Sequence, residues 1–149
     1  MSIGKVPDGA IVLFDTPAFV YYLERHPGYY SQAAELFERM VDGRLTGCAS
    51  VVVLTELLVP FYGRSEPVRA RGLSSAIRSI PNLRVLDVTT GIAERAAQLR
   101  SKHTLRTPDA LHFATGLEYG AEWFITNDRR LQRIRGEGIR VVLFTATSG

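Results

Sequence analysis

The chain has 149 residues, of which 46% are hydrophobic and 22% charged, as expected for a globular protein with a sizeable core. Its one cysteine, Cys48, excludes a disulfide framework or a thiolate zinc site and indicates a reducing compartment. Residues 1–9 lack the apolar core of a signal peptide, and the longest apolar stretch, residues 48–62, is too short for a membrane span and contains Glu56. We therefore expect one domain over residues 1–149, cytoplasmic and without a membrane partner.

The basic residues are uneven in kind. The net charge is +3, and among the cations lysine occurs only at positions 5 and 102 while the remaining 16 are arginines. Arginine makes planar, bidentate contacts with phosphate, so this bias permits a nucleic-acid partner. A compositional bias of the genome explains it equally well, and charge alone decides nothing here.

Short β-branched runs alternate with amphipathic stretches, a pattern that predicts repeated strand–helix–strand units. The predicted strands are residues 10–14, 44–49, 83–88, 122–126 and 139–144. The predicted helices are residues 16–26, 29–43, 50–63, 66–80, 89–103, 107–120 and 127–136. Right-handed crossovers between such strands give an α/β fold, with a parallel sheet of about five strands flanked on both faces by about seven helices.

The β-branched content of residues 50–63 also suits a strand. The length of this segment and the capping residue Ser50 favour a helix. Pro17 and Pro108 each stand in the first turn of a predicted helix, where proline is tolerated.

Four carboxylates stand near the ends of these elements. Asp15 follows the first predicted strand, Asp128 follows the fourth, and Asp109 opens the helix of residues 107–120. Glu56 lies six residues into a helix that follows the second strand. Ligands of open parallel sheets sit beyond the carboxyl ends of the strands, so we expect these four acids to meet in one pocket there.

Structural explanations exist for each acid by itself. Asp15, Asp109 and Asp128 all stand at helix starts, where a carboxylate caps free N–H groups or meets the helix dipole. Glu56 is surrounded by apolar residues, and a buried glutamate without a partner costs several kcal/mol. The alternative for Glu56 is that its helix turns it to solvent.

If the four acids converge, they need a neutralising partner. Two carboxylates about 4 Å apart repel by roughly 4 kcal/mol at an effective dielectric near 20. Mg²⁺ or Mn²⁺ suits such oxygen ligands, and these ions polarise a phosphoryl oxygen and activate water for attack on a phosphodiester. Arg129 and Arg130, directly after Asp128, either contact backbone phosphates or form a solvated face.

The segments "VLFDTPAF", "VVVLTELL" and "TPDALHFATGLEYGAEWFITNDRRL" resemble the PIN-domain ribonucleases, in particular the VapC-type toxins of toxin–antitoxin pairs. The likeness extends over residues 10–144. It implies a three-layer α/β/α sandwich and metal-dependent endonucleolytic cleavage of RNA, with Mg²⁺ or Mn²⁺ as cofactor. It also implies a homodimer that is held by a cognate VapB-type antitoxin.

The resemblance also assigns roles to residues. The catalytic and metal-binding acids fall on Asp15, Glu56, Asp109 and Asp128. Thr126 and Asn127 fall on supporting positions, and Arg106, Arg129 and Arg130 are candidates for contact with RNA. Pro17 departs from the family, because many relatives carry a small polar residue there, and we expect this to alter only the start of the helix.

An interface is expected near the first helices, where antitoxin segments of the family lie in a groove and reach the acids with an arginine or lysine. The aromatic candidates for this antitoxin or dimer interface are Tyr21, Tyr22, Tyr29, Tyr30, Phe61 and Tyr62. Aromatic residues are enriched in interface cores. Plain packing against the protein core is the alternative for the set.

Two other functions remain open. A phosphatase of the haloacid-dehalogenase type also begins with an acid after a strand, but it needs a second acid where this chain has Pro17. A non-catalytic module that binds RNA or a protein partner would use the acids as caps only. His112, three residues after Asp109, could touch substrate, although packing in the core is favoured for it.

Overall fold

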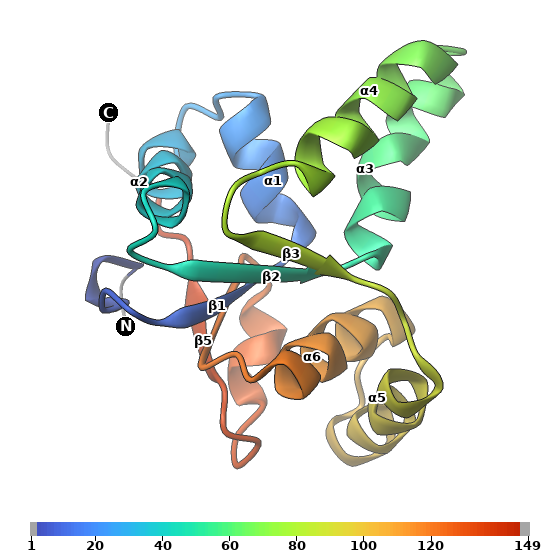
Figure 1. Ribbon diagram of the computed structural model, residues 1–149. Coiled ribbons are helices and arrows are strands. Elements are labelled where there is room, and N and C mark those ends of the chain that lie inside the picture. The colour runs from blue at the N-terminus through green and yellow to red at the C-terminus, as the bar shows by residue number, and fades with distance from the viewer. Residues whose placement is uncertain (1–2, 147–149) are drawn as a thin grey trace.

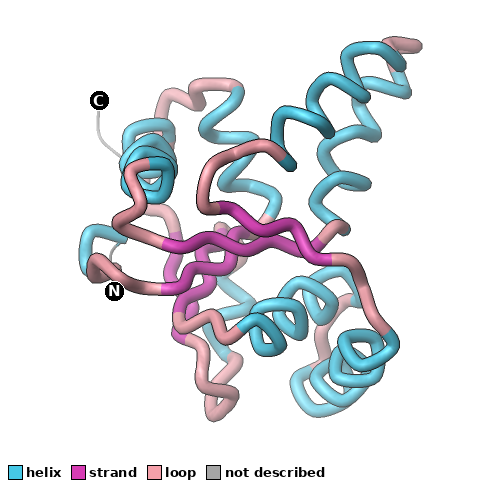
Figure 2. The backbone as a smooth tube through the Cα atoms, viewed as in Figure 1, coloured by secondary structure: helices cyan, strands magenta, loops and turns pink. Residues whose placement is uncertain are grey.

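The computed structural model describes residues 3–146, and a parallel sheet of five strands lies at its centre (Figures 1 and 2). The strands are β1 (Ile11–Phe14), β2 (Thr46–Ser50), β3 (Leu83–Leu86), β4 (Trp123–Thr126) and β5 (Arg140–Leu143). Their order in the sheet is β3-β2-β1-β4-β5, and every neighbouring pair is parallel. The first strand of the chain is therefore the central one.

Helices cover both faces of this sheet. They are α1 (Thr16–Leu23), α2 (Tyr30–Val41), α3 (Val52–Gly63), α4 (Pro67–Arg78), α5 (Thr90–His103) and α6 (Thr107–Tyr119). Figure 1 shows α1 to α4 on one side of the sheet and α5 with α6 on the other. The predicted three-layer α/β/α sandwich is confirmed.

The predicted number of helices is wrong by one. Within residues 3–146 there are six α-helices, and two short 3₁₀ segments, η1 (Ile3–Lys5) and η2 (Arg129–Arg133). The seventh predicted helix, residues 127–136, is replaced by η2, after which Ile134 is extended (φ −73°, ψ 115°). Gly136 and Gly138 follow with positive φ, so too few residues remain for an α-helix to propagate.

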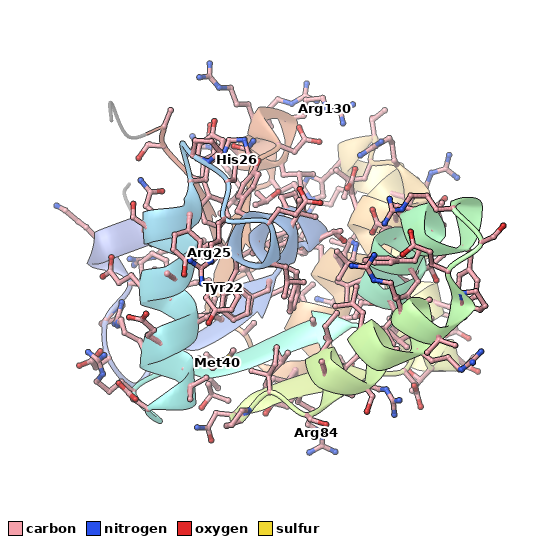
Figure 3. All side chains as sticks on the ribbon, turned by 90° about the horizontal axis from the view of Figure 1, so that it is seen from above. Tyr22, Arg25, His26, Met40, Arg84 and Arg130 are labelled. Atoms are coloured by element: carbon pink, nitrogen blue, oxygen red, sulfur yellow. The ribbon has the colours of Figure 1, made fainter. Side chains whose placement is uncertain are left out.

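The core forms two layers because side chains of a strand alternate between the faces of the sheet. From β1, Val12 and Phe14 pack toward α1 to α4, whereas Leu13 packs toward α5 and α6. The ring of Phe14 stacks on Phe37 of α2 with centroids 5.0 Å apart. Met40 reaches from α2 toward the sheet (Figure 3). The central strand is thus packed on both faces, which fixes the position of Asp15, the residue that follows it.

Helix α6 packs against β1 at Gly116. A Cβ atom added at Gly116 would stand 2.6 Å from Cδ2 of Leu13 and 3.3 Å from its Cβ, so a larger residue would force the buried Leu13 side chain to shift. His112 and Asp109 lie four and seven residues before Gly116, on the same face of the helix. The stripe that contacts β1 therefore continues to the point where β1 ends.

The α3–α4 pair stands away from the sheet at one corner of the molecule (Figure 1). Three apolar side chains on this hairpin face solvent: Val59 is 62% exposed, Tyr62 53% and Val68 71%. No helix within residues 3–146 combines the length and hydropathy needed to cross a bilayer.

Candidate active site

A cleft of about 360 Å³ lies at the carboxyl ends of the central strands. Its walls include all four predicted acids, Asp15, Glu56, Asp109 and Asp128. They come from the end of β1, from α3, from the first turn of α6 and from the residues after β4. The predicted convergence of these residues, which are far apart in the sequence, is observed.

Asp15 and Asp109 are the most buried of the four acids, each 7% exposed. Oδ1 of Asp15 accepts a hydrogen bond from the Thr16 backbone N–H at 2.9 Å, and its Oδ2 accepts one from the Thr126 hydroxyl at 2.6 Å. Burial raises the pKa of Asp15, although His112 and the Thr126 hydroxyl oppose this rise. Capping of α1 therefore satisfies only part of this carboxylate, and its charge is poorly compensated.

Glu56 is not buried, since 39% of its side chain is exposed, yet it links three helices. Helix α3 begins at Val52, whose backbone N–H donates to the Ser50 hydroxyl, and this start places Glu56 over α1 and α6. Its Oε1 accepts from the Thr16 hydroxyl at 3.1 Å and lies 2.7 Å from Nε2 of His112. The hydrogen bond with His112 is the main reason why the pKa of Glu56 is lowered.

His112 is buried, as predicted, but it packs against the acids. Its Nε2 lies 2.7 Å from Glu56 and 3.6 Å from Oδ1 of Asp15, and its side chain is 1% exposed. Its Nδ1 is buried and has no hydrogen-bond partner among the described residues. The spacing from Asp109 was the available signal for this residue, and it was too weak to separate core packing from a position within the site.

The other two acids are paired with arginines. Nε of Arg106 lies 3.0 Å from Oδ2 of Asp109. Arg130 holds both oxygens of Asp128, with Nε 3.0 Å from Oδ1 and Nη2 2.6 Å from Oδ2, and this pairing lowers the pKa of Asp128. Arg130 lies at the edge of the molecule seen from above (Figure 3). Of the three predicted RNA-binding arginines, only Arg129 has a side chain that forms no hydrogen bond or ion pair with the described residues.

The site suits a hard divalent cation by its chemistry, since its ligands would be carboxylate oxygens. Within residues 3–146, however, no three His, Cys, Asp or Glu side chains are arranged to hold one ion together. The guanidinium groups of Arg106 and Arg130 stand beside Asp109 and Asp128 and neutralise them. An ion bound to all four acids would have to displace these arginines.

The aromatic candidates for an interface divide into two groups. Tyr21, Tyr22 and Tyr29 pack on the core, with Tyr21 stacked on Tyr29 at 4.6 Å and Tyr22 on Phe37 at 4.8 Å. Tyr30 stacks on Tyr22 at 6.0 Å, with Arg25 over its ring. On the hairpin, Arg64 and Arg69 lie over the ring of Phe61, and Tyr62 is exposed. Packing accounts for most of the tyrosines near α1, while Tyr62 is open to solvent.

The fold and the cleft define a class, parallel α/β proteins with a pocket of acids at the carboxyl edge of the sheet. Residues 12–137 match the family model described as the PIN domain. The chain therefore belongs to the PIN domain family. A comparison with curated protein sequences gave no significant match.

Solved structures share the fold. A chain of the VapBC2 complex from Rickettsia felis, bound to a promoter DNA fragment, has 18% identity and a TM-score of 0.70, over 91% of this chain and 99% of that one. DNA-bound VapBC from Salmonella typhimurium has 21% sequence identity and a TM-score of 0.65, over 90% of this chain and 97% of that one. FitAcB from Neisseria gonorrhoeae has 18% identity and a TM-score of 0.59, over 89% of this chain and 96% of that one.

Proposed function

We propose that this protein is a metal-dependent endoribonuclease that acts as the toxin of a VapBC-type toxin–antitoxin pair. The observation that carries the proposal is the convergence of Asp15, Glu56, Asp109 and Asp128, from four separate elements, on one cleft. Membership of the PIN domain family, whose members are in general nucleases, supports hydrolysis of phosphodiester bonds.

The four acids would hold Mg²⁺ or Mn²⁺. When bound, such an ion polarises a phosphoryl oxygen and activates the attacking water. Thr126 fixes Asp15 by donating its hydroxyl hydrogen to Oδ2. His112 holds Glu56 in place through the hydrogen bond between their side chains. Separately, the amide of Asn127 is held because it donates to the Tyr21 hydroxyl at 2.6 Å.

We propose RNA, a VapB-type antitoxin and a second copy of this chain as the partners. The neighbouring solved structures are themselves toxin–antitoxin or VapBC complexes, which supports this choice. The exposed apolar part of the α3–α4 hairpin, with Phe61 and Tyr62, is the proposed dimer contact. The half-buried tyrosines near α1 would line the antitoxin groove. The protein would act as a single domain in the cytoplasm.

The proposal is tested by incubating the purified full-length protein with total RNA in Mn²⁺ or in EDTA. We expect cleavage only with the ion. Asp15→Asn and Asp109→Asn should each slow cleavage by roughly a hundred- to a thousandfold, because metal binding supplies several kcal/mol of charge stabilisation. Circular dichroism should show an intact fold in both variants.

A matched control is Arg133→Gln, which changes an exposed arginine of η2 that contacts no acid. It should cut RNA at the wild-type rate. Cleavage that persists in EDTA, or either Asn variant cutting as fast as the wild type, would contradict the proposal.

One observation favours the second candidate, a module that binds RNA or a protein partner without cutting. Asp109 and Asp128 are already neutralised by arginines, as acids with a structural role would be. Calorimetric titration with Mn²⁺ separates the two functions, because only the nuclease should bind the ion. The phosphatase alternative gains nothing, since Pro17 lines the cleft where a second acid would be needed.

A further inference from the structure

A second hollow, of about 690 Å³, adjoins the acid cleft. Asn127 and Arg129 line both cavities, so the two form one continuous depression. Beyond these shared residues, its walls include Tyr29, Gln132 and Ala146. The volume lies within the roughly 300–1,000 Å³ that is usual for small-molecule sites.

Interactions within the protein hold part of the wall of this hollow in place. On one side, the amide of Gln32 donates to the Thr145 carbonyl at 2.7 Å and accepts from the Thr145 backbone N–H at 3.0 Å. On the other side, Tyr29 is held in a stack with Tyr21, and Phe144 packs its edge against both rings at 6.1 and 5.1 Å. This part of the hollow is therefore formed before any ligand arrives, whereas the side chains of Arg129 and Gln132 remain available to a ligand.

The charges and polar groups around the hollow are available to a ligand. Arg129 and Gln132 are exposed, and their side chains form no hydrogen bond or ion pair within residues 3–146. Among residues 3–146, no carboxylate side chain lines this hollow. An unpaired guanidinium complements a phosphate, and an amide complements the polar edge of a base. An aromatic wall complements the apolar face of the base.

We propose that this hollow is a subsite for the nucleotide next to the scissile phosphate of a single-stranded RNA. Arg129, on the shared rim, contacts the phosphate between the two cavities, and the base enters the hollow beside Tyr29 and Gln132. A single strand is required because a paired and stacked base cannot be inserted in this way. This inference rests on the proposed nuclease function and adds the path that the substrate takes.

The test uses the full-length protein and a fluorescein-labelled single-stranded RNA of mixed sequence, with fluorescence anisotropy measured in EDTA so that no cleavage occurs. Ala146→Trp fills the hollow, and Gln132→Ala removes the amide. We expect Ala146→Trp to weaken RNA binding by about tenfold, the size of one lost base–aromatic contact, and Gln132→Ala to weaken it by a smaller factor. The matched control Ala97→Trp, in an exposed position that lines a different hollow on α5, should bind as the wild type does.

The subsite is refuted if both variants bind RNA as tightly as the wild type, or if the wild type does not bind RNA in EDTA. It is also refuted if Ala146→Trp abolishes association with a co-expressed protein partner while RNA binding is unchanged. If Ala146→Trp lowers the melting temperature of the protein, its RNA affinity is not interpretable, and the RNA affinity of Gln132→Ala decides whether the subsite exists. The proposed function fails separately, if the wild type cuts no RNA with Mn²⁺, so the two failures are distinguishable.

Discussion

At the scale of single residues, the cleft neutralises two of its four acids with its own arginines. Arg130 contacts both oxygens of Asp128, and Arg106 pairs with Asp109. Charge-assisted pairs of this kind are short and directional. A divalent ion would have to compete with the arginines for the same oxygens, so the proposed metal affinity should depend on them.

Removing one competitor should therefore strengthen metal binding. We expect Arg130→Gln to bind Mn²⁺ roughly two- to fivefold more tightly than the wild type, the range expected for the loss of one exposed ion pair. Titration calorimetry measures this directly, without RNA. Arg133→Gln removes the same charge from the same segment and should leave the affinity unchanged. An Arg130→Gln protein with equal or weaker affinity would show that the pair does not compete with the ion.

The sequence predicted the acids but not their partners, for a physical reason. Asp15, Asp109, Asp128 and Glu56 could be found because each stands at a fixed place relative to a strand or helix. The pairing of Arg130 with Asp128 depends on η2: two residues apart on an α-helix, these side chains would diverge. Asp128 instead caps the 3₁₀ turn, its Oδ1 accepting the Arg130 backbone N–H at 2.9 Å, and this turns the arginine back onto it.

At the scale of elements, the close approach of α6 to β1 positions half of the site. Gly116 permits the contact with Leu13, and the same helix face carries His112 and Asp109 to the end of the central strand. The sequence predicted α6 almost to the residue. It could not indicate that Gly116 was needed for packing, since a glycine inside a helix is compatible with many environments.

Substitution at this contact should be costly. We expect Gly116→Ala to lower the free energy of unfolding by about 1–3 kcal/mol, because the new methyl group meets Leu13 and Ile139 in a packed core. Gly72→Ala is the matched control, since a methyl group added at this glycine of α4 would have nothing within 4 Å. It should raise the free energy of unfolding by up to about 1 kcal/mol through helix propensity. Urea unfolding measures both, and equal effects would contradict the packing argument.

At the scale of the whole molecule, the α3–α4 hairpin leaves apolar side chains uncovered at a corner. Beside them, Glu66 contacts both Arg64 and Arg69. An exposed apolar patch of this kind marks a contact with another protein, and a second copy of this chain is the partner that we propose. Sequence patterning predicted both helices correctly. It could not show that they lie away from the sheet, because their position depends on the path of the chain from β2 through α3 and α4 to β3.

A charge placed on this surface should separate the copies. We expect Val59→Asp to convert a homodimer into a monomer, because the carboxylate would be desolvated at the interface. Size-exclusion chromatography with light scattering measures the molar mass. Val88→Asp, at a 37% exposed valine outside the hairpin, should remain dimeric. A monomeric wild type, or a dimer that survives Val59→Asp, would remove the hairpin as the contact.

The strand order also bears on how the protein is made. β1 lies between β2 and β4, yet β4 is synthesised more than a hundred residues after it. On a nascent chain, one edge of β1 therefore stays unpaired until β4 has been synthesised, and Asp15 lacks its hydrogen bond from the Thr126 hydroxyl until then. A chain that is terminated before residue 126 would have neither Thr126 nor Asp128, so the cleft of four acids should be incomplete in such a translation product.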